Sequence, residues 1–372
     1  MQLVIERSEL LKALGHVTSV VERRTTIPIL SNVLLMANEQ GLGFKATDLE
    51  REVVEHVGAD VAQAGAVTVP AHLIHDIARK LPDGAQVSLS RDPEKERVSV
   101  TSGHSKFALQ ALPADDFPDL AAGAMTHEFS LAAHELKRLI EKTRFAISTE
   151  ETRYYLNGIY LHTVEVDGAL MIRAVATDGH RLAQVELPAP EGAAEMPGVI
   201  IPRKTVHELF RLLDDTTNEV QIGVSPTKVR FAIGPVTVVS KLIDGSFPDY
   251  VRVIPQANDK DMRVSNGEFM SAVDRVSTIA SERGRAVKLN LNADKLVLSV
   301  NNPEGGSATE ELDISYGADT LEIGFNAKYL LDIAQQLESD TVHFKLADPS
   351  APTIVRDGDD QSALYVLMPM RV

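Results

Sequence analysis

The sequence predicts an α+β protein made of three tandem copies of one domain. The 372 residues are too many for a single core. Similar segments recur with a period of about 130 residues, as expected for internal duplication. Each copy also combines two helix-like patterns with several short alternating runs, which predicts helices packed on mostly antiparallel sheet.

The clearest repeated feature is a short strand that leads directly into a helix. The three expected helices cover residues 71–81, 203–213 and 327–338. Pro70 and Pro202 stand where a helix starts and an N–H is dispensable, and Asn326 suits the N-cap. One acidic column recurs inside these helices, at Asp76, Glu208 and Asp332.

A second helix is expected before each of these, over residues 7–24, 132–147 and 267–285. Their apolar residues recur at spacings of three and four, which is typical of an amphipathic helix. Between the helices, apolar and polar residues alternate in runs such as VSLSR, RVSVTS, KFALQAL and VHFKL, separated by turn residues. We expect six to eight strands per copy, and domains over 1–124, 127–255 and 262–372.

The composition restricts the chemistry. Hydrophobic residues make up 44% and charged residues 24%, which is typical of a folded globular chain. There is no cysteine, so disulfides, cysteine-bound metals and thiol nucleophiles are excluded. The N-terminus has no signal-peptide pattern, and no stretch approaches the roughly 20 apolar residues of a membrane helix. We expect a cytoplasmic protein with no membrane contact, no metal and no cofactor.

Charge is distributed unevenly along the chain. The net charge is −16, which by itself argues against nucleic acid. However, the six expected helices hold 17 Lys and Arg against 11 Asp and Glu, whereas the whole chain has 37 against 53. Helix surfaces often carry Lys and Arg without any function. The alternative is a basic helical surface within an acidic body, suited to holding a polyanion loosely.

Several motifs, in order and at matching spacing, resemble those of the bacterial beta sliding clamps, subunit beta of DNA polymerase III. They are RYYLNG (153–158), ATDGHRL (176–182), FPDY (247–250), NNPE (301–304) and MPMRV (368–372). The resemblance covers the whole chain. It implies a head-to-tail homodimeric ring that encircles double-stranded DNA without sequence preference and tethers polymerases for processive synthesis. It also implies partners that bind through a short peptide: the polymerase III catalytic subunit, the clamp loader, other polymerases and repair proteins.

The expected DNA-facing residues are mostly cations on or beside the helices. They are Arg24, Arg79, Lys137, Arg138, Tyr155, Arg203 and Lys204. Arg24, Arg79, Arg203 and Lys204 match positions that the family uses near DNA. Two positions depart from better-known clamps, His72 where a cation is expected and Glu150 where an amide is expected. A solvated helix face remains the simpler explanation for any one of these cations.

The resemblance also places a shallow apolar groove for partner peptides. Its residues are Leu156, Thr177, Gly179, His180, Arg181, Leu182, Pro248, Arg252, Val253, Asn326, Tyr329, Val366, Leu367, Met368, Pro369, Met370 and Arg371. We expect Leu182, Val253, Val366 and Met368 to form the floor and Met370 a movable lid. Arg181 and Arg252 are expected at the rim, with their charged groups turned to a partner. Gly284 stands where some relatives present an aromatic side chain. A final core strand would also account for the MPM ending.

The expected dimer contact joins the first domain of one copy to the third domain of the other. The first domain offers a basic edge strand with His104, Lys106 and Phe107. The third offers Ile279 on its first helix and an acidic set, Glu304, Glu310 and Glu311. Such an arrangement suits a closed, heterologous interface. Ordinary exposed strands with protective charges would have a similar sequence.

Two other functions remain open from the residues alone. The first is a metal-dependent or acid–base enzyme that uses Asp48, Asp178 and His180. No phosphate-binding loop, dinucleotide fingerprint or metalloprotease motif is present, which counts against it. The second is an interaction module that does not bind DNA, which the charge distribution disfavours. We therefore expect a non-catalytic processivity factor with no catalytic residues.

Overall fold

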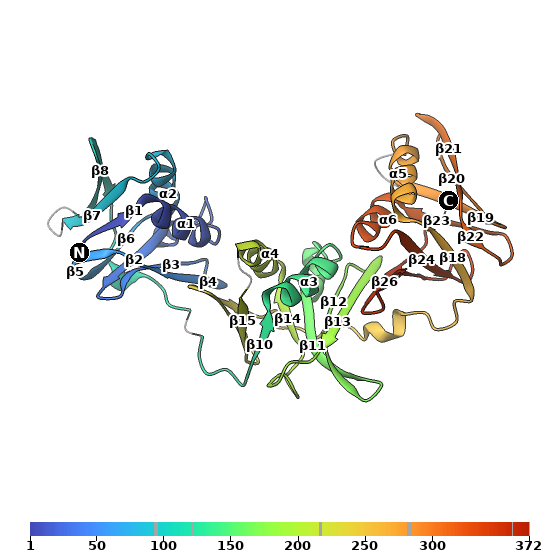
Figure 1. Ribbon diagram of the computed structural model, residues 1–372, viewed down its shortest axis with the longest axis horizontal. Helices are drawn as coiled ribbons and strands as arrows, with labels where there is room; N and C mark the ends of the chain where they lie inside the picture. The colour runs from blue at the N-terminus through green and yellow to red at the C-terminus, as the bar shows by residue number, and fades with distance from the viewer. Residues whose placement is uncertain (93–95, 121, 216–217, 281–284, 359, 372) are drawn as a thin grey trace. The chain divides into compact units, whose positions relative to one another are not determined.

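The computed structural model describes residues 1–92, 96–120, 122–215, 218–280, 285–358 and 360–371, shown as ribbon in Figure 1. Gly284 lies outside the described residues. The chain forms two compact units, and the central repeat is divided between them. The first unit contains Met1–Leu136, Pro190–Pro197 and His207–Leu242. The second contains Lys137–Ala189, Gly198–Val206 and Ile243–Val372.

The first unit contains two antiparallel sheets. The five-stranded sheet has the order β5 (Asp60–Gln63), β1 (Gln2–Glu6), β7 (Gln86–Asp92), β8 (Arg97–Ser102), β9 (Ser105–Gln110). The eight-stranded sheet has the order β10 (His127–Ala132), β15 (Glu219–Val224), β16 (Lys228–Ile233), β17 (Val236–Lys241), β4 (Arg51–Val57), β3 (Gly41–Thr47), β2 (Asn32–Asn38), β6 (Gly65–Pro70).

The second unit also contains two antiparallel sheets, one large and one small. Its nine-stranded sheet has the order β14 (Val199–Pro202), β11 (Gly158–Val166), β12 (Ala169–Thr177), β13 (Arg181–Pro188), β26 (Ala363–Leu367), β25 (Thr353–Asp357), β24 (Thr341–Leu346), β18 (Lys260–Ser265), β22 (Ser315–Tyr316). Its four-stranded sheet has the order β21 (Gly306–Asp313), β20 (Lys295–Asn302), β19 (Ala286–Asn292), β23 (Leu321–Asn326).

Six α-helices lie in the described part of the chain, two in each repeat. They are α1 (Arg7–Val17), α2 (Ala71–Lys80), α3 (Ala133–Arg144), α4 (Arg203–Leu212), α5 (Asn266–Ser277) and α6 (Ala327–Ala334). In Figure 1, α1 and α2 lie side by side in the first unit, as do α5 and α6 in the second. Short 3-10 turns complete the list: η1 (Pro28–Ser31), η2 (Ala114–Asp116), η3 (Glu151–Leu156), η4 (Leu213–Asp215) and η5 (Tyr250–Val253).

Helix starts match the sequence prediction better than helix ends. Pro70 is the N-cap of α2, and the Asn326 side chain caps α6 by accepting from the Lys328 N–H. The helices predicted over 7–24 and 267–285 are too long, because α1 stops at Val17 and α5 at Ser277. At the end of α1 the Thr18 hydroxyl donates to the Leu14 carbonyl at 2.6 Å, a local bond that competes with helix propagation.

The strand number also differs from the prediction. Among the described residues, the first and third repeats have nine strands each and the second has eight, against the expected six to eight. The extra strands include very short ones such as Ser315–Tyr316, whose two residues cannot show an alternating pattern. Alternation is clear in the central strands, for example along β19, where half-buried and buried residues alternate from Ala286 to Asn292.

The sheets connect one repeat to the next. β4 of the first repeat pairs with β17 of the second, within the eight-stranded sheet. β13 of the second repeat pairs in the same way with β26 of the third, within the nine-stranded sheet. We call these contacts junction 1 (β4–β17) and junction 2 (β13–β26). Within the described ranges, no helix is long and apolar enough to cross a membrane.

Candidate functional site

The ATDGHRL segment forms the tight turn between β12 and β13, at one end of junction 2. The Thr177 hydroxyl donates to the Arg181 carbonyl at 2.7 Å and accepts from the Gly179 N–H at 3.1 Å. Asp178 Oδ1 accepts from the backbone N–H groups of His180 and Arg181, at 2.9 and 3.0 Å. Asp178 therefore organises the turn, and its carboxylate does not act as an acid–base partner of the His180 ring.

Gly179 is required at this turn for two reasons. Its φ is +88°, in the left-handed region that favours glycine. A Cβ at this position would also lie 2.4 Å from Nη1 of Arg153. Arg153 in turn donates two hydrogen bonds to Glu150, at 2.8 and 2.7 Å. The hydrogen bond from Arg153 holds the pKa of Glu150 below its usual range. Glu150, where an amide was expected, thus fixes the cation that covers the glycine.

Arg181 is not a rim cation, so this part of the prediction is wrong. The residue is only 7% exposed. Its Nε and Nη1 donate to Asp178 at 3.1 Å and Asp332 at 2.5 Å, and Nη2 donates to the Phe145 carbonyl at 2.7 Å. The guanidinium also lies 4.3 Å from the Tyr329 ring centroid. These contacts neutralise the guanidinium inside the fold. Arg181 therefore connects the turn to α6 and to the residue that follows α3.

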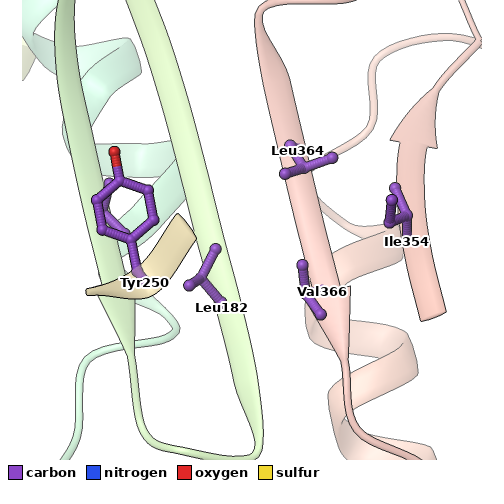
Figure 2. Close-up of a cluster of buried hydrophobic side chains, with 6 residues drawn as sticks. Leu182, Tyr250, Ile354, Leu364 and Val366 are labelled. Carbon is purple, nitrogen blue, oxygen red and sulfur yellow. The ribbon is translucent and has the colours of Figure 1, made fainter. Parts of the chain in front are cut away.

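Beside this turn, apolar side chains from several strands form one buried cluster. Its members are Val175, Leu182, Tyr250, Ile354, Leu364 and Val366. Figure 2 shows Leu182 on β13, Leu364 and Val366 on β26, and Ile354 on β25, with Tyr250 next to Leu182. Leu182 lies directly opposite Val366, and Val366 directly opposite Ile354. The predicted floor residues Leu182 and Val366 therefore meet, although both are only 2% exposed.

The C-terminal tail continues past β26 and is held by backbone bonds on two sides. The Met368 N–H donates to the His180 carbonyl at 2.9 Å, and the Met370 N–H donates to the Gly324 carbonyl at 2.8 Å. Met368 is 39% exposed, whereas Pro369 and Met370 are half-buried. The ending is thus a strand, β26, followed by a fixed tail that presents methionine side chains beside the cluster.

The remaining predicted groove residues lie around this floor. Val253, 48% exposed, and Arg252 belong to η5, and Pro248 is exposed just before it. Arg252 Nε lies 2.7 Å from Asp249, and both side chains are mostly exposed. The place of Arg252 at a groove rim stays a prediction. The rings of His180 and Tyr329 stack with centroids 6.3 Å apart. Asn326 caps α6, and Leu156 is buried at the end of η3.

Sequence reasoning missed the polar support of the floor. The Tyr250 hydroxyl bonds to His162 Nε2 and accepts from Arg173 Nη1, both at 3.0 Å. Arg173 also donates to Glu186 at 2.8 Å. Burial lowers the pKa of His162 despite its bond to the Thr163 carbonyl. One missed residue did leave a signal in the sequence, because Asp332, which holds Arg181, belongs to the repeated acidic column.

The expected DNA-facing cations of the first unit are exposed. Arg24 lies in a bend beyond α1 rather than on the helix, and Arg79 lies near the end of α2. Arg79 donates to Asp76 one turn earlier at 3.0 Å, a common surface pair. His72, where a cation was expected, bonds through Nε2 to the Val21 carbonyl at 3.0 Å. His72 therefore fixes the segment that precedes Arg24.

The second unit presents a mixed set. Arg203 and Lys204 are exposed at the start of α4, and Tyr155 is half-buried in η3. Lys137 is half-buried on α3. The prediction for Arg138 needs correction, because its guanidinium donates hydrogen bonds to Glu338, Asp360 and the Ser362 hydroxyl. A cation used in this way does not serve as a free phosphate contact, so we exclude Arg138 from the proposed DNA surface.

Each unit also has an unpaired edge strand, as predicted for the first domain. β9 is the edge of the five-stranded sheet, and it exposes Lys106 and Phe107, the latter by 37%. His104 precedes it in the turn from β8. β21 is the edge of the four-stranded sheet. β9 and β21 each leave one side of their backbone without a partner strand among the described residues.

The predicted acidic set lies on and near β21, but two of its members are already paired. Glu310 accepts from Arg275 at 3.0 Å, and Glu311 accepts from Lys295 at 3.1 Å. Glu304 is exposed in the turn before the strand. Ile279 lies in the turn beyond α5 and not on the helix, and its carbonyl accepts from Asn302 at 2.9 Å. The expected simple attraction between a basic edge and an acidic edge is therefore weaker than the sequence indicates.

With this geometry established, the relatives decide the family. Three family profiles match: the DNA polymerase III beta subunit N-terminal domain over residues 1–121, the central domain over 130–249, and the C-terminal domain over 251–371. The chain belongs to the DNA polymerase III beta subunits, the beta sliding clamps. The Caulobacter vibrioides beta sliding clamp is 52% identical over 372 residues, and the Escherichia coli protein 39% over 373, each covering all of both chains.

Solved structures agree over the same length. The Bartonella birtlesii sliding clamp, solved bound to griselimycin, is 54% identical, with a TM-score of 0.98 and full coverage of both chains. The Caulobacter crescentus sliding clamp is 52% identical, with a TM-score of 0.96 and full coverage of both chains. The predicted architecture of three tandem clamp domains is therefore confirmed. The function is that of a DNA polymerase III sliding clamp, a processivity factor, and the enzyme hypothesis has no support among these relatives.

Proposed function

We propose that this sliding clamp works as a ring of two copies arranged head to tail around duplex DNA, in the bacterial cytoplasm. The observation that supports the ring is the equivalence of its strand edges. β4 and β13, which follow equivalent turns, each pair with the last strand of the next repeat, β17 and β26. β21 is the strand of the third repeat that is equivalent to β4 and β13. β9 is the last strand of the first repeat and is equivalent to β17 and β26. β9 and β21 are both free edges.

Pairing β9 of one copy with β21 of the other would create a third junction of the same type. It would join a five-stranded and a four-stranded sheet into one of nine strands, the size of the sheet at junction 2. A head-to-tail contact repeated twice closes a ring. Backbone bonds would supply most of the contact, and burial of Phe107 would add about 1.5–3 kcal/mol.

Phe107→Asp should therefore produce monomers, because it places a charge at this edge. Leu170→Asp is a matched control, since Leu170 is another exposed apolar residue, 41% accessible, near the start of β12 in its hairpin with β11. Light scattering at low micromolar concentration should give the mass of one chain for the first variant and two for the control. A Phe107→Asp protein that stays dimeric would contradict the assignment.

The helices are proposed to face the DNA. As observed, they hold 13 Lys and Arg against 8 Asp and Glu, in a chain of net charge −16. The proposed set is Arg24, Arg79, Lys137, Tyr155, Arg203 and Lys204. Few direct bonds suffice, because a closed ring holds DNA by topology. Contacts to phosphate alone carry no sequence information, which suits a protein that must slide.

Junction 2 is proposed to be the site where partners bind. An extended peptide with one or two apolar anchors would lie against Leu182, Val253, Val366 and Met368. The polymerase III catalytic subunit, the clamp loader and other replication or repair proteins would share it through short segments. Such a small site should give micromolar affinity, roughly −8 kcal/mol, which suits partners that exchange.

Deleting residues 368–372 tests this groove. The deletion removes the bonds from Met368 to His180 and from Met370 to Gly324 but leaves β26 intact. Binding of a QLSLF peptide, measured by fluorescence anisotropy, should disappear while the ring still assembles. Deleting only residues 371–372 is the matched control and should retain most of the affinity. Unchanged affinity in the longer deletion would rule out the tail as part of the site.

A further inference from the structure

The face of the nine-stranded sheet that carries the apolar cluster continues beyond it into a row of basic side chains. Side chains two residues apart on a strand share a face, so Arg356 lies on the same face of β25 as Ile354 of the cluster. Arg356 is directly opposite His343 of β24, and His343 is directly opposite Arg263 of β18. Lys345 of β24 is directly opposite Ile354. We call Arg263, His343, Lys345 and Arg356 the cationic strip.

The strip lines a hollow in the surface. A pocket of about 400 Å³ is bounded by the four strip residues together with Asp261, Gly358 and Gln361. Arg263 and Lys345 are exposed, and neither forms an ion pair with any residue that the structure describes. Arg356 is half-buried, and its Nη1 donates to the Gln361 carbonyl at 3.2 Å. Burial disfavours the charged form of Arg356 and lowers its pKa. An anion bound nearby would stabilise this charged form.

Acidic residues limit what the strip can accept. Asp261 lies opposite Lys345, and Glu338 and Asp340 line an adjoining hollow that also contains Arg263 and His343. A long polyanion such as DNA would meet these carboxylates on leaving the strip. The surroundings therefore favour a short anionic segment, with two or three negative charges, over a phosphate backbone.

We propose that the cationic strip binds acidic residues that flank the apolar anchor of a partner peptide. The proposal rests on the proposed function of junction 2. From Val366 on β26 to Arg263 on β18 there are three strand steps, or roughly 14 Å at ~4.8 Å per step. An extended chain covers that distance in about four or five residues, at ~3.3 Å each. A partner with two or three Asp or Glu within this distance of its anchor would engage the groove and the strip together.

The strip would then set specificity and not the basic affinity. Ion pairs at exposed positions contribute little individually and weaken with salt. They would nevertheless rank partners that share the same apolar anchor, since those with acidic flanks would be favoured and those with basic flanks would be repelled. Partners that compete for one groove would in this way be ordered by charges outside it.

The test compares five peptides by fluorescence anisotropy on the full-length dimer. They are QLSLF alone, QLSLF with a flanking Glu-Asp-Glu-Asp segment, and QLSLF with Ser-Gly-Ser-Gly, each flank placed at either end. The acidic flank at one end should tighten binding about five-fold in about 50 mM salt and by less than about two-fold in about 500 mM salt. The neutral flank should have no effect at either end.

Two variants with the same change in net charge locate the effect. Arg263→Ser/Lys345→Ser should remove the gain, while Lys12→Ser/Lys80→Ser, which changes two exposed lysines of α1 and α2, should keep it. Because both variants alter only exposed side chains, binding of QLSLF itself should stay the same. Circular dichroism before each titration ensures that only folded protein is compared.

The outcomes separate the two claims. If QLSLF alone does not bind, the proposed groove fails and the strip proposal fails with it. If QLSLF binds but the acidic flank brings no gain, or the gain survives Arg263→Ser/Lys345→Ser, the strip proposal alone is overturned. A single-stranded oligonucleotide that binds the native dimer but not this variant, with no gain from the acidic peptide, would assign the strip to nucleic acid and also overturn it.

Discussion

Junctions 1 and 2 have the same backbone arrangement but differ in the side chains beside them. Junction 2 has exposed Val253 and Met368 next to a buried apolar floor, whereas the exposed apolar residue at junction 1 is Leu49, in its turn. The turns Thr47–Arg51 and Thr177–Arg181 share their hydrogen bonds: the threonine hydroxyl donates to the arginine carbonyl, at 2.8 and 2.7 Å. At the end of β17 the Lys241 N–H donates to the Glu50 carbonyl at 2.8 Å, just as the Met368 N–H donates to the His180 carbonyl after β26. The backbone is therefore the same, and the side chains make the difference.

Two positions distinguish the junctions. Beside junction 1 the floor has Lys45 on β3 and Glu52 on β4. The equivalent positions beside junction 2 are Val175 on β12 and Leu182 on β13. Lys45 Nζ lies 3.0 Å from Glu52 and also donates to Asp119, and the Leu120 N–H donates to Glu52 at 3.0 Å. This ion pair is largely buried and pins the segment around Asp119 onto the sheet. At junction 2 the equivalent Asp249 turns outward to Arg252, which leaves the apolar floor next to exposed Val253 and Met368.

The comparison shows that the repeat supplies the same backbone at both junctions, while the floor residues and the tail differ between them. On the proposed function, these side chains decide which junction can bind a partner. An exposed apolar surface has no benefit for the isolated chain and is typical of an interaction site. At junction 1 the equivalent surface instead carries Lys45, which forms ion pairs with Glu52 and Asp119. The predictions below exchange these residues, from the largest expected effect to the smallest.

Placing the junction 1 residue into junction 2 should have the largest effect. Leu182→Glu buries a carboxylate beside Val366 without a cation, so it should lower the free energy of unfolding by roughly 2–4 kcal/mol. Peptide binding should fall at least about a hundredfold, because the floor becomes charged. Leu182→Met, a volume-conserving control, should change stability by less than about 1.5 kcal/mol. Denaturant unfolding and fluorescence anisotropy measure the two effects.

Adding the second residue refines this prediction. Val175→Lys/Leu182→Glu rebuilds the ion pair of junction 1 and should recover part of the lost stability, but none of the peptide binding. Recovery of binding together with stability would show that the floor chemistry does not decide function.

The reverse exchange at junction 1 should have a smaller effect on stability. Lys45→Val/Glu52→Leu replaces a buried pair by apolar residues, which is often neutral or favourable, so stability should change by less than about 2 kcal/mol. Lys45→Val alone leaves Glu52 without its cation and should cost roughly 3 kcal/mol. The double variant should still not bind QLSLF at this junction, because Lys241 and Leu242 stand where Met368 and Pro369 provide the tail. A second peptide site in a calorimetric titration would contradict this.

The smallest effects are opposite pH responses of the two junctions. Burial alone would lower the pKa of Lys45, but its bonds to Asp119 and Glu52 outweigh burial and raise that pKa above 10.5. This stabilisation is complete below the unfolded value and is lost as the pH rises through the folded pKa. Lys45→Val/Glu52→Leu should therefore flatten the alkaline limb of the stability curve.

At junction 2 the response is expected at acid pH. Burial lowers the pKa of His162 below its ordinary value of 6.5. The unfolded chain then binds a proton more readily, so stability falls as the pH drops below 6.5. His162→Gln should reduce this acid dependence and leave the alkaline limb unchanged. Thermal unfolding from mildly acid to alkaline pH measures both limbs, and a variant that changes the opposite limb would refute the assignment.

The sequence predicted the repeats and the helix starts, because these depend on local spacing and turn chemistry. Asn326 and the Thr177–Asp178 turn show this, since each makes its bonds within a few residues, and Pro70 fixes the start of its helix through its own ring. The groove residues came from the resemblance to the sliding clamps, and the groove stays a prediction. Contacts between distant segments were not predictable in the same way. The burial of Arg181 by Asp332 and Phe145, and the use of Arg138 by Asp360, join residues far apart in the chain. A charge on a helix therefore looks free in the sequence even where the fold neutralises it.

The most direct test of the central claim is amide hydrogen exchange of the dimer with and without the QLSLF peptide. The claim is that junction 2, and not junction 1, receives the partner. Exchange should slow in residues 177–183 and 364–371, whereas the equivalent residues 47–53 and 236–243 should exchange at the same rate with and without peptide. Equal slowing at both junctions, or no slowing in 364–371, would contradict the account.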